Sequence, residues 1–173
     1  MRAKPLMSKV FGKISLIQPK IKATWADRIF LTFDIDWACD AVLADTIDIV
    51  EAAGVEATWF VTHDTPLIER LRGNSLFELE IHPNFNYLLE GDSRNGANAA
   101  EVVDRLLAIV PEARSVRSHS MTQSSRLLEL FLERKLTHDV NHFIPDHSGV
   151  ELQPWSHWNV LVKVPYFWED DAH

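Results

Sequence analysis

The chain has 173 residues, of which 46% are hydrophobic and 24% charged, and this composition is typical of a globular protein with one sizeable core. Its formal net charge of -8 argues against nucleic acid as a general partner. The single cysteine, Cys39, excludes an internal disulfide and a multi-thiol metal site. No apolar run is long enough to span a membrane, and Lys9 and Lys13 interrupt any signal-peptide core, so we expect a cytoplasmic protein.

Basic side chains dominate the start of the chain. Residues 1–25 carry the following lysine and arginine residues and no acid: Arg2, Lys4, Lys9, Lys13, Lys20 and Lys22. This segment shows no clear periodicity apart from a short strand that we expect over residues 13–16. We therefore predict a basic N-terminal extension over residues 1–25, followed by one catalytic domain over residues 26–173.

The stretch from residue 28 to residue 36 is the most informative part of the sequence. Its residues are mostly apolar or β-branched up to residue 33, which is typical of a buried strand, and it then runs into Asp34 and Asp36. Side chains alternate along a strand, so the two carboxylates point the same way. Two neighbouring acids at the end of a buried strand need a cation, a proton or a polar surrounding, which indicates a site.

Strands and helices alternate along the rest of the chain. Strands are predicted over residues 28–34, 56–62, 76–82, 114–118, 137–141 and 159–167, helices over 42–53, 67–72, 98–110 and 123–135, a long loop over 83–97 and irregular structure over 142–157. This alternation predicts an α/β fold with a parallel sheet and helices packed outside it. An open sheet and a barrel both satisfy the pattern, and in both folds ligands bind at the carboxyl ends of the strands.

Polar residues collect at those strand ends. They are Asp34, Asp36, Thr62, His63, His82, Arg117, His119, Asp139, Asn141, Asp170 and Asp171. A metal site could use one of the two first acids as a ligand and the other as a general base, although Asp36 could instead cap the following helix. His82 suits a metal ligand at a strand end, and Arg117 suits a partner for a carboxylate.

Three further features leave alternatives open. His119 could complete a metal site or donate a proton, and it shares a face with Arg117 if the strand continues that far. The cluster of Asp170, Asp171 and His173 either joins the site or is a frayed chain end. Glu78 and Glu80 share the parity of His82; if they point inward they would be buried acids beneath the site, and an edge or solvated strand face is the simpler interpretation.

These motifs resemble those of the polysaccharide deacetylase family over residues 28–173. Residues 31–36 are similar to the family's Thr-Phe-Asp-Asp motif with Ile35 inserted between the acids, and residues 58–61 are similar to its second strand. His82 matches the first histidine of the family's His-x-x-x-His motif, where Asn86 replaces the second histidine. Arg117 matches the arginine of its Arg-x-Pro motif.

The resemblance implies a distorted (β/α) barrel, incomplete at its C-terminus, and a role for each residue. Asp34 would be the base, Arg117 its partner and His173 the proton donor, while Asp36, His82 and His119 would hold a divalent metal, with zinc preferred. The implied reaction is the removal of N-acetyl groups from an amino sugar or polysaccharide precursor. Two alternatives stay open, another amide- or ester-cleaving metallohydrolase on the same fold and a non-catalytic carbohydrate-binding domain.

Overall fold

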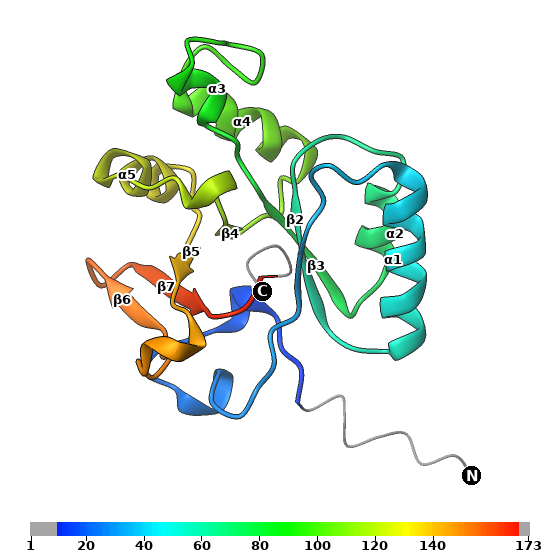
Figure 1. Cartoon of the computed structure of the whole chain (residues 1–173), viewed down its shortest axis with the longest axis vertical. Helices are drawn as coiled ribbons and strands as arrows, with labels where there is room; N and C mark the ends of the chain where they lie inside the picture. Colours follow the sequence, from blue (N-terminus) through cyan, green and yellow to red (C-terminus); the bar gives the residue numbers. More distant parts are fainter. Residues whose placement is uncertain (1–9, 170–173) are drawn as a thin grey trace.

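Seven strands form one sheet in the computed structural model, which describes residues 10–169 (Figure 1). The strands are β1 (Thr32–Asp34), β2 (Ala57–Val61), β3 (Phe77–Ile81), β4 (Ser115–Val116), β5 (His138–Phe143), β6 (Trp155–His157) and β7 (Leu161–Tyr166). Their order is β1-β2-β3-β4-β5-β7-β6, and all neighbours are parallel except β6 and β7. The sheet stays open between its edges β1 and β6, so the expected α/β fold with a distorted, incomplete barrel is confirmed.

Helices connect the parallel strands. They are α1 (Asp40–Ala53), α2 (Ile68–Gly73), α3 (Asn86–Leu89), α4 (Ala99–Ile109) and α5 (Ser125–Glu133), with 3-10 turns at Ile14–Leu16, Lys22–Thr24, His119–Met121 and Asp146–Ser148. Side-chain caps begin the longer late helices, since Asn98 accepts a hydrogen bond from the Glu101 N–H and Ser124 accepts one from the Leu127 N–H. Gly54 ends α1 in a left-handed conformation, at a φ of 65°. Within residues 10–169, no helix is long and apolar enough to cross a membrane.

Each face of the sheet has its own apolar core. The larger core packs the buried faces of the helices against alternate strand residues, such as Trp59 and Ile81. The smaller core lies on the opposite face, where Ile14 and Ile17 from the N-terminal segment pack with Phe60, Val140 and Val164. Ile14, Ile17 and Phe60 are among the largest fully buried side chains, so the segment before β1 is part of the core.

The N-terminal segment differs from the expected short strand. Residues 14–16 form a 3-10 turn, and hydrogen bonds that involve side chains, in place of strand pairing, join the segment to β2 and β3. The Lys13 ammonium donates to the carbonyls of Ser75 and Phe77, at 2.7 and 3.0 Å. The Ile14 N–H donates to the Thr58 hydroxyl at 3.4 Å.

Three other boundaries also differ from the sequence prediction. The first strand covers only Thr32–Asp34, and the residues before it contribute a single bridge between Phe11 and Ile29. Strand β6 occupies part of the segment expected to be irregular, where its exposed residues give no alternation to detect. The short helix α3 lies inside the expected long loop.

Glu78 and Glu80 point into the barrel interior, so the simpler interpretation, an edge or solvated strand face, is wrong, and the inward alternative holds. The Glu78 carboxylate accepts hydrogen bonds from the Ser15 and Thr58 hydroxyls, at 2.5 and 2.6 Å. Glu80 is only 2% exposed and accepts from the backbone N–H groups of Arg114, at 2.6 Å, and Ser115. Burial, reinforced by the charge of Glu78, raises the pKa of Glu80 to about 8, against the opposing effect of these backbone hydrogen bonds.

Candidate active site

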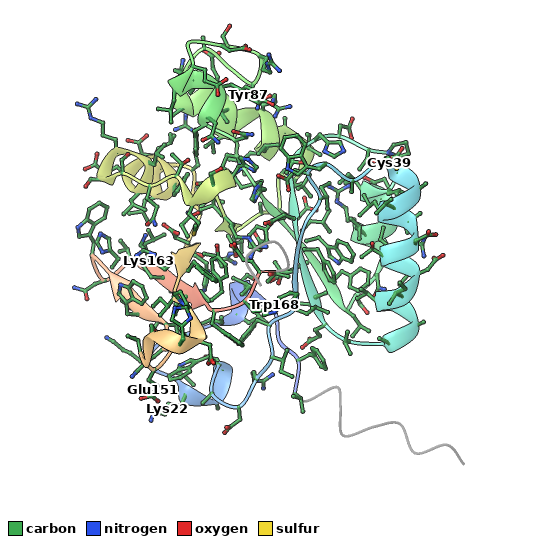
Figure 2. All side chains as sticks on the ribbon, in the orientation of Figure 1. Lys22, Cys39, Tyr87, Glu151, Lys163 and Trp168 are labelled. Atoms are coloured by element: carbon green, nitrogen blue, oxygen red, sulfur yellow. The ribbon has the colours of Figure 1, made fainter. Side chains whose placement is uncertain are left out.

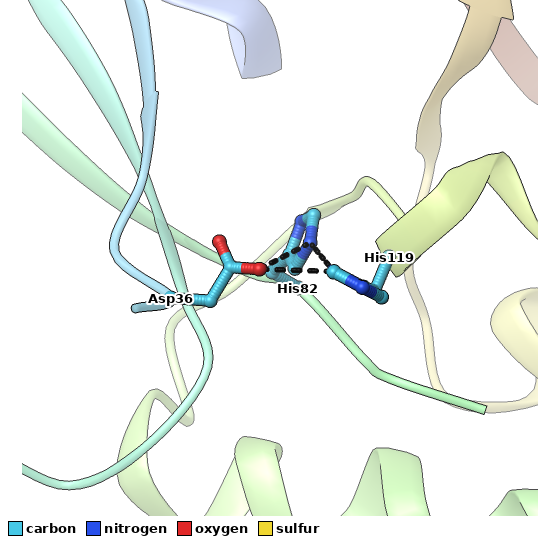
Figure 3. Close-up of side chains that lie close together, drawn as sticks. All are labelled: Asp36, His82 and His119. Carbon is cyan, nitrogen blue, oxygen red and sulfur yellow. Dashed lines mark hydrogen bonds and ion pairs between the residues drawn. The ribbon is translucent and has the colours of Figure 1, made fainter. Parts of the chain in front are cut away.

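One carboxylate and two imidazoles converge at the carboxyl end of the sheet (Figure 3). Asp36 Oδ2 lies 2.9 Å from His119 Nδ1 and 3.8 Å from His82 Nε2, and the two ring nitrogens are 3.4 Å apart. Ligand atoms of the three residues lie within 4.8 Å of one another, which is the spacing expected of groups that could bind a single ion. We call Asp36, His82 and His119 the Asp/His/His cluster.

The sheet explains why these three residues meet. Asp36 follows β1 by two residues, His82 directly follows β3, and His119 follows β4. The backbone extends the register past the strand ends, because the His82 N–H donates to the Val61 carbonyl and the His119 N–H donates to the Pro83 carbonyl. Parallel strands therefore deliver residues that are far apart in the chain to one edge.

A second group, Asp34 and Arg117, lies beside the cluster. Arg117 is 7% exposed and donates through Nε and Nη2 to Asp34 Oδ1, at 3.0 and 2.7 Å. Its Nη1 donates to the Thr32 hydroxyl at 3.0 Å, and its guanidinium stacks 4.3 Å from the centre of the Phe60 ring. The guanidinium is therefore fixed in position and holds one oxygen of Asp34.

His82 links the two groups. Its Nε2 faces the cluster, while its Nδ1 is buried 3.2 Å from Asp34 Oδ1 without the alignment of a hydrogen bond. Burial alone would raise the pKa of Asp34, but the positive charge of Arg117 and the interaction with His82 outweigh it, so the pKa lies below the ordinary value. Asp34 is therefore a carboxylate at neutral pH and can accept a proton.

Asn86 occupies a different place from the cluster. Its Nδ2 donates to the Ser120 hydroxyl at 3.1 Å, and its Oδ1 accepts from the Thr122 hydroxyl at 3.5 Å. These bonds connect the start of α3 to the turn that carries His119. Asn86 thus supports the neighbouring loop, and His119 supplies the second nitrogen near Asp36.

The comparison with family models decides the family. The model described as WbmS-like, polysaccharide deacetylase, matches residues 31–173. The chain belongs to the WbmS-like polysaccharide deacetylase family. The family resemblance inferred from the sequence motifs is therefore confirmed.

Two solved structures are similar to this member of the WbmS-like family. One, from Bordetella bronchiseptica, is a proposed polysaccharide deacetylase involved in O-antigen biosynthesis; it is 52% identical, with a TM-score of 0.90, and the match covers 95% of this chain and 68% of that one. The other, a proposed polysaccharide deacetylase from Mycobacterium smegmatis, is 15% identical, with a TM-score of 0.56, and the match covers 96% of this chain and 62% of that one. The second likeness shows the fold alone. No curated protein matches the chain significantly.

Not every polar residue at a strand end joins the site of this WbmS-like protein. Asp139 is fully buried in an ion pair with Lys163, at 2.6 Å, on the strand pair β5–β7 (Figure 2 labels Lys163). Asn141 accepts a hydrogen bond from the Ser118 N–H at 2.7 Å, so it anchors the turn next to His119. Thr62 and His63 contact each other, at 2.7 Å. Asp170, Asp171 and His173 lie outside the described residues.

The sequence interpretation missed several residues around Arg117. Thr32 precedes Asp34 by two residues in the same strand, so both side chains point to the same face, and this spacing could have identified Thr32. Tyr166 places its ring 5.5 Å from the Arg117 guanidinium and donates its hydroxyl to Glu169. Burial raises the pKa of the Tyr166 hydroxyl above its ordinary value, so it stays a neutral donor. No local pattern links Tyr166 to Arg117, because the contact depends on how β7 lies in the sheet.

Proposed function

We propose that this protein is a metal-dependent hydrolase that removes N-acetyl groups from an amino sugar in a polysaccharide precursor. The observation that carries the proposal is the juxtaposition of the Asp/His/His cluster with an ionised Asp34 held by Arg117. Family membership supports the same reaction. The Bordetella bronchiseptica neighbour, which is involved in O-antigen biosynthesis, supports a surface polysaccharide as the origin of the substrate.

The cluster residues fit a divalent cation. Asp36 offers a carboxylate oxygen, and His82 and His119 each offer a ring nitrogen, a donor set that suits zinc and also cobalt, manganese or iron. Three protein ligands leave room for water or substrate, as a catalytic site requires. We prefer zinc because two of the three donors are imidazoles.

The reaction requires a proton acceptor, a proton donor and stabilisation of the developing oxyanion. A divalent ion, when bound, lowers the pKa of water and polarises the acetyl carbonyl. Asp34 accepts the proton of the attacking water, and Arg117 orients Asp34 and keeps it ionised until that step. We assign proton donation to the leaving amine to His173, on its resemblance to the family's histidine. Water and the acetamide then yield acetate and a free amino sugar.

Acetate release from N-acetylated sugars tests the proposal. The protein is loaded with zinc or cobalt and incubated with nucleotide-linked N-acetylhexosamines and with N-acetylated oligosaccharides. We expect stoichiometric acetate and free amine, loss of both after chelation, and loss of turnover by about 10²- to 10⁴-fold in Asp34→Asn, with metal binding retained. Asp92→Asn is the matched control, because Asp92 pairs with Arg94 on the surface. Turnover that survives Asp34→Asn would contradict the role of Asp34.

The same assay separates the rival functions. A metallohydrolase of another specificity would bind metal and cleave other amides or esters without releasing acetate from any of these sugars. A carbohydrate-binding domain would bind the sugars and show no turnover at all. Either result would overturn the proposed deacetylation.

A further inference from the structure

Trp37 combines three properties that the proposed chemistry does not use. It directly follows Asp36, its backbone is left-handed with a φ of 66°, and it is 86% exposed. This exposure is the highest among the large apolar side chains within residues 10–169. Because so little of its surface is buried, the Trp37 side chain contributes almost nothing to the stability of the fold.

The backbone at Trp37 adds a cost. A left-handed conformation is unfavourable for a residue with a bulky side chain, whereas glycine or asparagine would adopt it readily. Residues held in such conformations cluster at ligand sites. The turn itself is needed because the chain must change direction between the end of β1 at Asp34 and the start of α1 at Asp40. The turn does not explain why a tryptophan occupies the position.

The position of the ring indicates a ligand. The centre of the Trp37 indole lies 6.0 Å from the centre of the His119 imidazole, with the ring planes at 58°. The indole therefore stands at the rim of the Asp/His/His cluster, with most of its surface in solvent. A substrate whose reacting group is at the cluster would lie next to this surface.

We infer that Trp37 is a specificity-determining residue that stacks on the sugar ring whose N-acetyl group lies at the Asp/His/His cluster. This inference rests on the proposed function. The C–H face of a pyranose is apolar and matches an indole face, and the acetamide extends from the edge of the ring. Simple acetamides and acetate esters have no such face, so Trp37 favours saccharides over them.

The chain offers a matched control. Trp158 is also exposed, at 48%, and also left-handed, with a φ of 51°, in the turn between β6 and β7. The centre of its ring lies 4.4 Å from the centre of the His157 ring, and within residues 10–169 no ring contact joins it to the Asp/His/His cluster. Replacing either tryptophan by glycine therefore removes an exposed indole from a position whose backbone suits glycine.

The kinetic experiment compares Trp37→Gly, Trp37→Phe and Trp158→Gly in the metal-loaded protein. For an N-acetylated oligosaccharide we expect Trp37→Gly to raise KM at least about 10-fold with little change in kcat, and Trp37→Phe to retain most of the affinity. For ethyl acetate, an ester without a ring that could stack on the indole, kcat/KM should change less than about threefold. Equal losses on both substrates, an unchanged KM, or the same loss in Trp158→Gly would overturn the inference.

A binding experiment keeps this inference separate from the proposed function. We expect N,N′-diacetylchitobiose to quench the tryptophan fluorescence of the metal-loaded protein, and this quenching to be lost in Trp37→Gly and retained in Trp158→Gly. Metal affinity and melting temperature should not fall in Trp37→Gly, because glycine relieves the backbone. If no acetate is released but this quenching occurs, only the proposed reaction fails. If acetate is released but quenching is identical in Trp37→Gly, the role of Trp37 fails.

Discussion

The Nη2 atom of Arg117 lies 2.7 Å from the Oδ1 atom of Asp34, although 83 positions separate the two residues in the chain. The contact is made by two nitrogens of one guanidinium, and a third nitrogen donates to Thr32. A lysine has a single ammonium and cannot reproduce this fork. The geometry therefore requires a guanidinium group at position 117, and a positive charge alone is not enough.

We predict that Arg117→Lys lowers kcat by about 10-fold or more while the metal affinity stays within about threefold of the parent value. The loss arises because Asp34 is less well oriented. Steady-state kinetics and metal titration measure the two effects. Arg94→Lys is the control, since Arg94 pairs with Asp92 on the surface. Full activity in Arg117→Lys would show that the contact of two guanidinium nitrogens with Asp34 Oδ1 has no catalytic importance.

Removal of either imidazole should weaken metal binding strongly. We expect His82→Ala and His119→Ala to weaken binding by about 100-fold or more, because each variant leaves two of three protein ligands. Isothermal titration with zinc or cobalt provides the measurement, and His147→Ala, which changes an exposed histidine, serves as the control. Tight binding in His119→Ala would mean that His119 is not a ligand and that another residue completes the site.

The buried carboxyl of Glu80 should make folding stability depend on pH. Its pKa of about 8 in the folded protein exceeds the ordinary value of 4.5, so the folded state holds a proton that the unfolded chain releases between these limits. The stabilisation that protonated Glu80 contributes is therefore fully present below about pH 4.5. It is lost as the pH rises toward 8, and the free energy of unfolding falls by up to about 1.4 kcal/mol per pH unit.

Glu80→Gln isolates this effect, because the amide oxygen can still accept from the Arg114 and Ser115 N–H groups. We expect the stability difference, variant minus parent, to become more positive between pH 5 and pH 9 in urea denaturation. A difference independent of pH would show that Glu80 titrates normally.

The buried ion pair of Lys163 and Asp139 supports the turn that carries His119. Lys163 is 2% exposed and also donates to Gln123 at 3.1 Å, while Asp139 accepts from the Asn141 N–H at 2.9 Å. Lys163→Met leaves a buried carboxylate without its cation, and we predict a loss of about 3–5 kcal/mol in the free energy of unfolding. Adding Asp139→Asn should recover part of this loss, because the amide keeps the bond to Asn141. A double variant less stable than Lys163→Met would contradict this account.

Sequence patterns predicted the convergence of the cluster residues better than the contacts of the residues around them. Asp34 and Asp36 follow a buried apolar run, and His82 ends a strand with strict alternation, so their meeting at one edge follows from local patterns and from the rules of parallel sheets. Local pattern left His119 open between a metal ligand and a proton donor, because β4 has only two residues and gives little periodicity, and the family resemblance favoured the ligand.

Other features depend on contacts that no local pattern encodes. Glu78 and Glu80 alternate with apolar residues in the same way on a solvated strand and in a polar barrel interior, so the sequence alone did not distinguish the two. Ile14 and Ile17 lie in a segment without periodicity, and their burial depends on the far strands β5 and β7. The Lys163–Asp139 pair likewise requires the register of β5 and β7.

The central claim is that Asp36, His82 and His119 bind one divalent ion. Anomalous diffraction from crystals grown with zinc, measured on both sides of the zinc absorption edge, tests it most directly. We predict one strong peak about 2.0–2.2 Å from Asp36 Oδ2, His82 Nε2 and His119 Nδ1. A fully loaded crystal without a peak at this position, or with its zinc bound at other residues, would contradict the account.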